Sequence, residues 1–206
     1  MPYTWDKATR KYYDDKGKPI SQGEVRRRGL RVVNKSSAAL AELAEEYTEG
    51  KIVFEEWAVG MREAVKAVHS AMVQLAYGGK ESMGPMERGR LGAVIRDQYK
   101  YLGGFLLEVE TGQVEGDGLR ARAEMYAEAS WGSHESSVAA REKAAGATEE
   151  RSFMEPEATH CQDCFDEASK GWVPIGSLVP IGERQCLARC QCNMEFRERG
   201  VGEDEV

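Results

Sequence analysis

The sequence predicts a mainly α protein, in which an amphipathic helical bundle carries an extended or hairpin N-terminal arm and a small C-terminal α+β module. Three observations lead to this prediction. Apolar residues recur at helical spacing through most of residues 24–144. Aromatic and polar residues alternate near the N-terminus, and all five cysteines lie between residues 161 and 192. We expect an arm, a helical body, a cysteine-rich module and an acidic tail over residues 1–22, 23–148, 149–198 and 199–206.

The arm is predicted from four aromatic residues, Tyr3, Trp5, Tyr12 and Tyr13, that alternate with polar ones. Turn-forming residues at 14–17 then separate this segment from Ile20. The pattern is typical of a short β-hairpin or an extended arm. Because an isolated two-stranded hairpin is only marginally stable in water, we expect it to lie against a partner, possibly another subunit.

The helical body is predicted as four amphipathic helices joined by short turns that contain glycine. The first runs from about residue 24 to Gly50, and Gly29 or the pair Ser36-Ser37 could break it. The second covers residues 54–77, with an apolar stripe of Trp57, Met61, Val65, Val68, Met72 and Leu75. The third begins at Pro85 and ends before Gly112. The fourth, capped by Asp117, could continue through Ala144.

Charge is unevenly distributed along the 206 residues. The net charge is −7, yet residues 1–35 hold ten Lys or Arg against four acids, a balance of +6 that leaves −13 for the remainder. Such a basic segment could contact nucleic acid or an acidic protein. The alternative is a solvated helix face around Arg26, Arg27 and Arg28.

The apolar stretches fall well short of the ~20 residues that a transmembrane helix needs, so we expect no membrane association. The first residues do not form the apolar region of a signal peptide. We therefore expect the protein to be made and kept in a reducing cytoplasm. In that compartment, neighbouring cysteines more often bind a metal than form disulfides.

The cysteines predict a structural zinc site in a zinc-knuckle module. Cys161 and Cys164 form a Cys-x-x-Cys pair, and Cys186, Cys190 and Cys192 follow after a loop. We expect the pair and two of the three later thiols to complete a tetrahedral sphere, with His160 also available. A β-strand would place Cys190 and Cys192 on one face, after a turn that holds Cys186. Free buried thiols, a disulfide and another metal cluster, including iron–sulfur, are the alternatives.

The sequence indicates no active site. His69 reads as a histidine at the edge of the core, and His134 lies on a helix without a paired nucleophile. Zinc-protease, phosphate-binding and nucleophile-elbow motifs are absent from the sequence. A zinc ion with four protein ligands leaves no open position for catalysis. We therefore expect a protein that is not an enzyme.

Three C-terminal segments carry a resemblance to a known family: His160-Cys161-Gln-Asp-Cys164, Ala168-Ser-Lys-Gly171-Trp172-Val-Pro, and Gly182-Glu-Arg-Gln-Cys186-Leu-Ala-Arg-Cys190-Gln-Cys192. They resemble the end of tailed-phage minor head proteins, the head-morphogenesis proteins of the phage Mu F type. That region of the family typically ends in a histidine followed by Cys-Arg-Cys. Here Gln191 replaces the arginine and Cys186 stands near the histidine position, which leaves the third and fourth ligands open. A weaker likeness extends upstream to about Trp5.

The resemblance implies a non-enzymatic virion component that is assembled in the host cytoplasm and acts in head assembly. Its implied partners are the portal protein, the major capsid protein or both, with several copies of the chain in the particle. Some members of the family are thought to accompany DNA. The alternative function is a zinc-stabilised nucleic-acid-binding protein that places residues 7–35 on phosphates.

Overall fold

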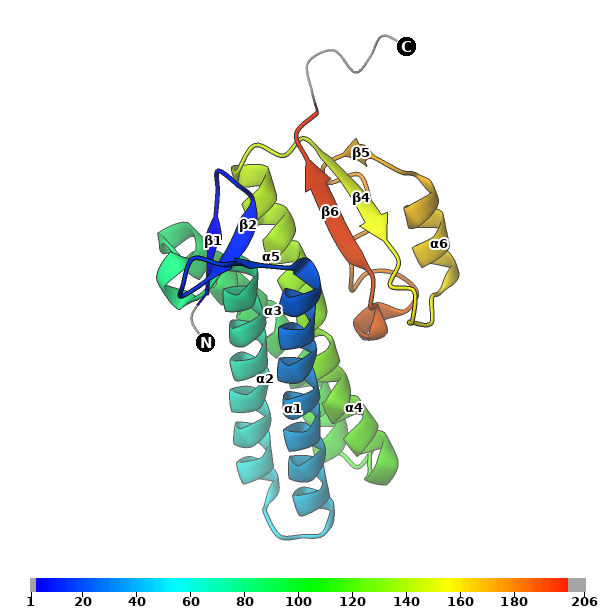
Figure 1. Cartoon of the computed structure of the whole chain (residues 1–206). Coiled ribbons are helices and arrows are strands. Elements are labelled where there is room, and N and C mark those ends of the chain that lie inside the picture. The colour runs from blue at the N-terminus through cyan, green and yellow to red at the C-terminus, as the bar shows by residue number, and fades with distance from the viewer. Residues whose placement is uncertain (1–2, 200–206) are drawn as a thin grey trace.

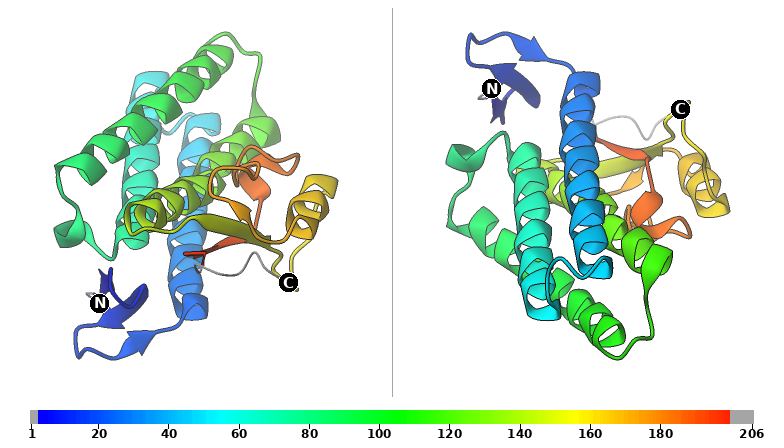
Figure 2. Two further views of the ribbon diagram at one scale, coloured as in Figure 1. Left: turned by 90° about the horizontal axis from the view of Figure 1, so that it is seen from above. Right: turned by 90° about the horizontal axis from the view of Figure 1, so that it is seen from below.

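The computed structural model describes residues 3–199 and is mainly helical (Figure 1). The predicted acidic tail therefore lies outside the described residues, apart from Arg199. The body consists of α1 (Gln22–Thr48), α2 (Phe54–Tyr77), α3 (Pro85–Glu110), α4 (Gly116–Glu128) and α5 (Ser130–Ala144). Helices α1 and α2 form a long antiparallel hairpin, with α4 packed on α1, and α3 and α5 packed on α2 (Figures 1 and 2).

The core of the body forms where the predicted apolar stripe of α2 meets its neighbours. All six residues of that stripe are at most 4% exposed, and Leu40 of α1 and Phe105 of α3 are fully buried against them. Trp57, in the first turn of α2, stacks on Tyr47 and lies edge-on to Phe105. Trp57 and Trp131 are both buried, as expected of the packing anchors in an amphipathic bundle.

The helix boundaries differ from expectation at three places. The N-cap of α4 is Glu115, so Asp117 lies in the first turn of that helix and does not cap it. Helix α1 is continuous through Gly29 and Ser36-Ser37, so the possible break does not occur. The fourth predicted helix instead divides at Ala129 into α4 and α5. At this junction the hydroxyl of the buried Ser130 donates a hydrogen bond of 2.6 Å to the Ala127 carbonyl. Such a local side-chain bond competes with the helix ladder and is associated with bends.

The N-terminal segment is a three-stranded antiparallel sheet rather than a two-stranded hairpin. Its strands β1 (Tyr3–Asp6), β2 (Lys11–Asp14) and β3 (Pro19–Ile20) are joined in sequence order. The turn predicted at residues 14–17 connects β2 to β3, and a second turn before Lys11 connects β1 to β2. The prediction missed the third strand because it is only two residues long.

This sheet packs on the helical body of its own chain, so the support expected for it comes from within the chain. The Tyr12 hydroxyl donates a 2.8 Å hydrogen bond to the Ala76 carbonyl at the end of α2. The guanidinium of Arg141 on α5 lies 4.2 Å from the centre of the Trp5 ring. Gly78 ends α2 with φ +79°, and the Trp5 backbone approaches so closely that no Cβ would fit there.

The C-terminal segment contains a second antiparallel sheet of strand order β5-β4-β6 (Figure 1). It consists of β4 (Glu149–Phe153), β5 (Val173–Pro174) and β6 (Asn193–Arg197), with helix α6 (Gln162–Ser169) between β4 and β5 in sequence. Strands were predicted at residues 151–154 and 193–196, and both are confirmed, with β4 beginning two residues earlier. Two 3₁₀ turns, η1 (Lys80–Ser82) and η2 (Leu187–Arg189), complete the fold.

The C-terminal segment shares one core with the helices. Cys164, Cys190 and Cys192 belong to the same buried apolar cluster as Trp131 and the α2 stripe. Strand β6 packs on α5, and η2 contacts both α4 and α5. The cysteine-rich end is thus built onto the bundle rather than tethered beside it. Within the described residues, no helix is long and apolar enough to cross a membrane.

Candidate metal centre

The first two cysteines lie at the start of α6. Cys161 is the residue before the helix, in an extended conformation, and Cys164 is in the first turn. The Cys164 amide donates to the Cys161 carbonyl at 3.1 Å, and this turn brings the two sulfurs to 3.5 Å. The Cys-x-x-Cys pair therefore sits on a helix N-terminus, whereas the sequence interpretation expected a two-stranded knuckle.

The other three cysteines surround the 3₁₀ turn η2. Cys186 precedes η2, as expected of a residue on the turn, and Cys190 follows it. Cys190 and Cys192 lie just before β6 rather than within a strand, which corrects the predicted strand. Both are at most 3% exposed while Gln191 between them is exposed, so the expected alternation of sides holds without strand pairing.

Three of the other four thiols lie within 4.0 Å of Cys164. Its sulfur lies 3.6 Å from that of Cys186 and 4.0 Å from that of Cys190, in addition to the contact with Cys161. A tetrahedral zinc ion with Zn–S bonds of about 2.3 Å places its sulfurs about 3.8 Å apart. The observed separations therefore fit a metal sphere. They are far longer than the S–S bond of about 2.05 Å in a disulfide, and all five thiols are free.

His160 and Cys192 form the other side of the cluster. The His160 Nδ1 atom lies 3.6 Å from the Cys192 sulfur, and the Nε2 atom lies 2.7 Å from the Glu155 carbonyl oxygen. Metal-binding histidines commonly donate their second ring N–H to such a carbonyl, which leaves the first nitrogen free as a ligand. His160 was expected to be available as a donor but lies outside the predicted set of cysteine ligands. Its position beside Cys161 was the signal.

A buried arginine supplies positive charge beside the sulfurs. Arg184 is fully buried, and its guanidinium donates to the Val179 carbonyl at 3.0 Å and to the Ser152 hydroxyl at 2.9 Å. The hydrogen bond with Cys192 lowers the pKa of Cys190 to about 5, and the charge of Arg184 contributes in the same direction. The same bond, together with burial, raises the pKa of Cys192. The cluster therefore favours a thiolate at Cys190 before any metal binds.

The ligand segments are also tied to the helical body. The Trp131 indole N–H donates to the Cys192 carbonyl at 3.3 Å. Arg26 of α1 donates to the Asn193 side chain at 2.8 Å and lies 3.2 Å from the carboxylate of Glu155, whose carbonyl faces His160. The side of the donor cluster formed by His160 and Cys192 is thus fixed by contacts from outside it.

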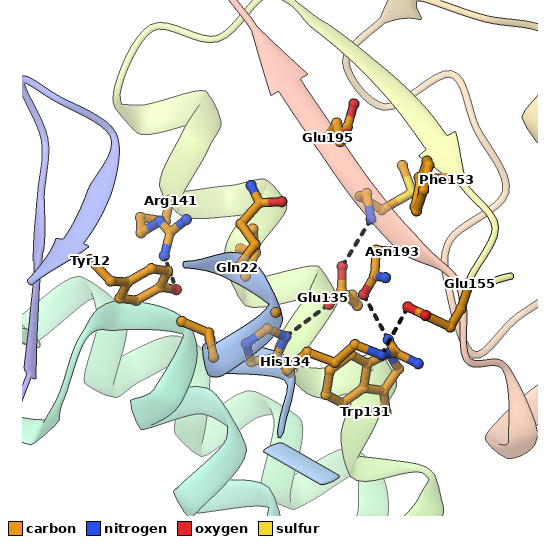
Figure 3. A pocket seen from close by; sticks show the side chains of 15 residues that line it. Tyr12, Gln22, Trp131, His134, Glu135, Arg141, Phe153, Glu155, Asn193 and Glu195 are labelled. Carbon is orange, nitrogen blue, oxygen red and sulfur yellow. Dashed lines mark hydrogen bonds and ion pairs between the residues drawn. The ribbon is translucent and has the colours of Figure 1, made fainter. Parts of the chain in front are cut away.

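A second candidate site is a cavity of about 260 Å³ between the start of α1, α5 and the C-terminal strands (Figure 3). Most of its polar groups bond to one another or to the surrounding chain, although the Nε2 atom of His134 and the Nε atom of Arg141 have no hydrogen-bond partner among the described residues. His134 stacks on Trp131 at 5.0 Å and contacts the Glu135 carboxylate at 2.9 Å. The other carboxylate oxygen of Glu135 accepts from the Met194 amide at 3.3 Å, and Arg141 pairs with Tyr12. These contacts join α5 to β6 and to the N-terminal sheet.

His69 is fully buried in the core rather than at its edge. Its Nδ1 atom lies 2.8 Å from the hydroxyl of Ser133, a residue that lines a surface hollow of about 560 Å³. This pair resembles a nucleophile and its base, and sequence spacing could not have indicated it. However, burial lowers the pKa of His69 to about 4, which makes a weak base. Its Nε2 atom has no hydrogen-bond partner among the described residues, so no acid orients the ring.

Comparisons with protein-family models, with curated proteins and with solved structures found no match to this chain.

The structure brings together all five predicted ligands, and His160 with them. The donors form two sets of three, and within each set all ligand atoms lie within 4.8 Å of one another. The first set is Cys161, Cys164 and Cys186, and the second is His160, Cys164 and Cys192. This donor cluster could hold a metal ion.

Proposed function

We propose that the chain is a non-enzymatic structural protein whose C-terminal segment is held in place by zinc. Cys161, Cys164, Cys186 and Cys190 are the ligands of the first ion, because the sulfurs of the other three lie 3.5 to 4.0 Å from that of Cys164. Four thiolates close the coordination sphere, so such an ion stabilises the fold and activates no water. The clustering of these four sulfurs is the observation that carries the proposal.

Zinc has a physical purpose in this segment. Residues 155–192 contain one short helix, one two-residue strand and one 3₁₀ turn, and few of their side chains are apolar and buried. Such a segment buries too little apolar surface to order itself. Metal binding would supply the missing free energy and fix η2 against α6.

We further propose that the protein acts as a minor head component of a tailed phage, in contact with the portal or major capsid protein and in several copies. The support is the residue pattern of segment 160–192 together with exposed apolar side chains on the helical body. Val59 of α2 and Leu107 of α3 are 52% and 58% exposed, and both line a groove between these helices. Exposed apolar patches commonly mark protein contacts.

Nucleic-acid binding by the basic N-terminal segment has less support. Arg27, Arg28 and Arg31 all pair with Glu24, at 2.9, 3.1 and 3.5 Å. Arg26 turns inward, with 13% of its side chain exposed, so the arginine triplet is not a uniform solvated face. Glu24 thus offsets one of these three charges, and Glu155 offsets that of Arg26. A DNA affinity that falls steeply with salt would restore this alternative.

One experiment tests both parts of the proposal. The purified protein is incubated with the portal and major capsid proteins encoded beside its gene, and bound zinc is quantified in the recovered complex. We expect stable binding and stoichiometric zinc. Cys161→Ser should lower the zinc content, whereas Gln191→Ala, at an exposed position between Cys190 and Cys192, should not.

The groove is tested separately. Leu107→Glu should weaken binding to the virion partner without changing the zinc content. Met86→Glu is the matched control, because Met86 is 72% exposed on the same helix and does not line the groove. Full zinc without any virion partner would refute the assembly role alone, and a metal-free protein would refute the zinc site.

A further inference from the structure

The donor cluster contains more ligands than one zinc ion can use. A tetrahedral ion takes four donors, and Cys161, Cys164, Cys186 and Cys190 satisfy it. His160 and Cys192 are left over, yet they also face the cluster, with their donor atoms 3.6 Å apart. Six donors are too many for one ion and too few for two separate ones.

Two tetrahedral ions require eight coordination positions, and six donors can fill them if two thiolates each bind both ions. Cys164 has the position of such a bridge, because it belongs to both sets of three donors. Cys190 is the candidate for the second bridging thiolate. Its sulfur lies 4.0 Å from that of Cys164, and it is the remaining thiol of the cluster, between Cys186 and Cys192 in the chain.

The separations match this arrangement on both sides. A zinc ion with bonds of about 2.3 Å to sulfur and about 2.05 Å to nitrogen places the two donor atoms about 3.6 Å apart. The Nδ1 atom of His160 and the sulfur of Cys192 lie 3.6 Å apart. The hydrogen bond from Nε2 to the Glu155 carbonyl holds the ring with Nδ1 directed at the cluster.

We propose that the donor cluster is a binuclear site for two zinc ions. Cys161 and Cys186 bind the first ion alone, His160 and Cys192 bind the second alone, and the thiolates of Cys164 and Cys190 bridge both. This inference rests on the proposed zinc binding and extends it from one ion to two.

The buried charges are consistent with two ions. Five thiolates and two divalent ions leave one negative charge, and the fully buried Arg184 beside the cluster carries one positive charge. One ion with four thiolates would leave two negative charges against the same arginine. Buried charges are costly unless they are compensated, so the binuclear site is the better balanced of the two.

The direct test is the metal stoichiometry of the intact chain, measured by native mass spectrometry and by elemental analysis under reducing, oxygen-free conditions. We expect two zinc ions per chain. His160→Ala and Cys192→Ser should each lower this value to one, and the control Gln191→Ala should keep two. One ion in the wild-type chain would overturn the binuclear site and leave the proposed structural zinc intact. A chain that binds none would refute the proposed function itself.

The bridging thiolates are tested without any variant. The protein is loaded with ¹¹³Cd, a spin-½ ion that replaces zinc in thiolate sites, and its cadmium NMR spectrum is recorded. We expect two resonances that split each other, because scalar coupling passes through a shared sulfur. Two resonances with no mutual splitting would overturn the bridges, even if the stoichiometry were two.

Discussion

Gly29 allows a sharp test of how α1 packs against the residues that support the donor cluster. A Cβ added at this buried position would lie 2.6 Å from Cζ3 of Trp131 and 3.3 Å from both Leu75 and Met72. Trp131 cannot easily move away. Its indole N–H is bonded to the Cys192 carbonyl, His134 stacks on it, and Arg26 lies 5.1 Å from its ring centre. The substitution Gly29→Ala should therefore destabilise the protein.

The expected magnitude follows from two opposing terms. Replacing glycine by alanine within a helix favours folding by about 1 kcal/mol. Forcing a methyl group into a packed core costs about 1–3 kcal/mol, and the upper end applies here because the ring is held on several sides. The free energy of unfolding should fall by about 2 kcal/mol. Gly104→Ala on α3 is the matched control, because its Cβ would meet no atom within 4 Å. It should stabilise the protein by up to about 1 kcal/mol.

The assay is urea unfolding of both variants in the presence of zinc, followed by circular dichroism and tryptophan fluorescence, with bound metal quantified. The two substitutions are chemically identical, so their difference isolates the contact with Trp131. If Gly29→Ala were as stable as Gly104→Ala, the indole would be free to move and the proposed rigid connection between α1 and Cys192 would be wrong.

Burial lowers the pKa of His69 to about 4, so the folded state resists protonation while the unfolded chain binds a proton near pH 6.5. Stability should fall by roughly 3 kcal/mol as pH drops from 6.5 to 4, and a ring resonance that titrates near pH 6.5 would contradict this. Leu187 has φ +46° and is 54% exposed. Leu187→Gly should therefore increase the free energy of unfolding by up to about 1 kcal/mol, which would be measured as a higher unfolding temperature. The buried Glu150 carboxylate accepts from the amides of Gly176 and Leu178 at 2.9 and 3.0 Å. Glu150→Ala should cost about 2–3 kcal/mol in urea unfolding and Glu150→Gln less, since an amide oxygen still accepts; equal losses would refute the role of these bonds.

The helices were predictable because their signal is local. The stripe from Trp57 to Leu75 has the spacing of a helix face, and every member is buried. The turn residues Gly78 and Gly112 also mark real helix ends. The junction at Ala129 was not predictable, because the apolar pattern continues across it and a single side-chain hydrogen bond marks it.

The candidate site was predictable in composition but not in arrangement. Cysteine spacing indicated a metal site, since thiol pairs at short separations are rare without one. Sequence could not show that Cys164 lies between two sets of donors, because that depends on how η2 packs on α6. Nor could it show that Arg184 is buried beside them, because arginine is usually exposed.

The packing of the N-terminal sheet also limits how two copies of the chain could join. The Tyr12 hydroxyl bonds to the Ala76 carbonyl, and Trp5 stacks on the buried Arg141. The side chains that the N-terminal sheet could offer to a second chain are therefore already in contact with its own helices. Two chains that exchanged their N-terminal sheets would form these same contacts between chains and would gain no new ones. Only Ser21 separates β3 from α1, so the hinge for such an exchange is very short. An equilibrium between closed and exchanged forms would therefore be governed by protein concentration and hinge strain, rather than by any new attraction.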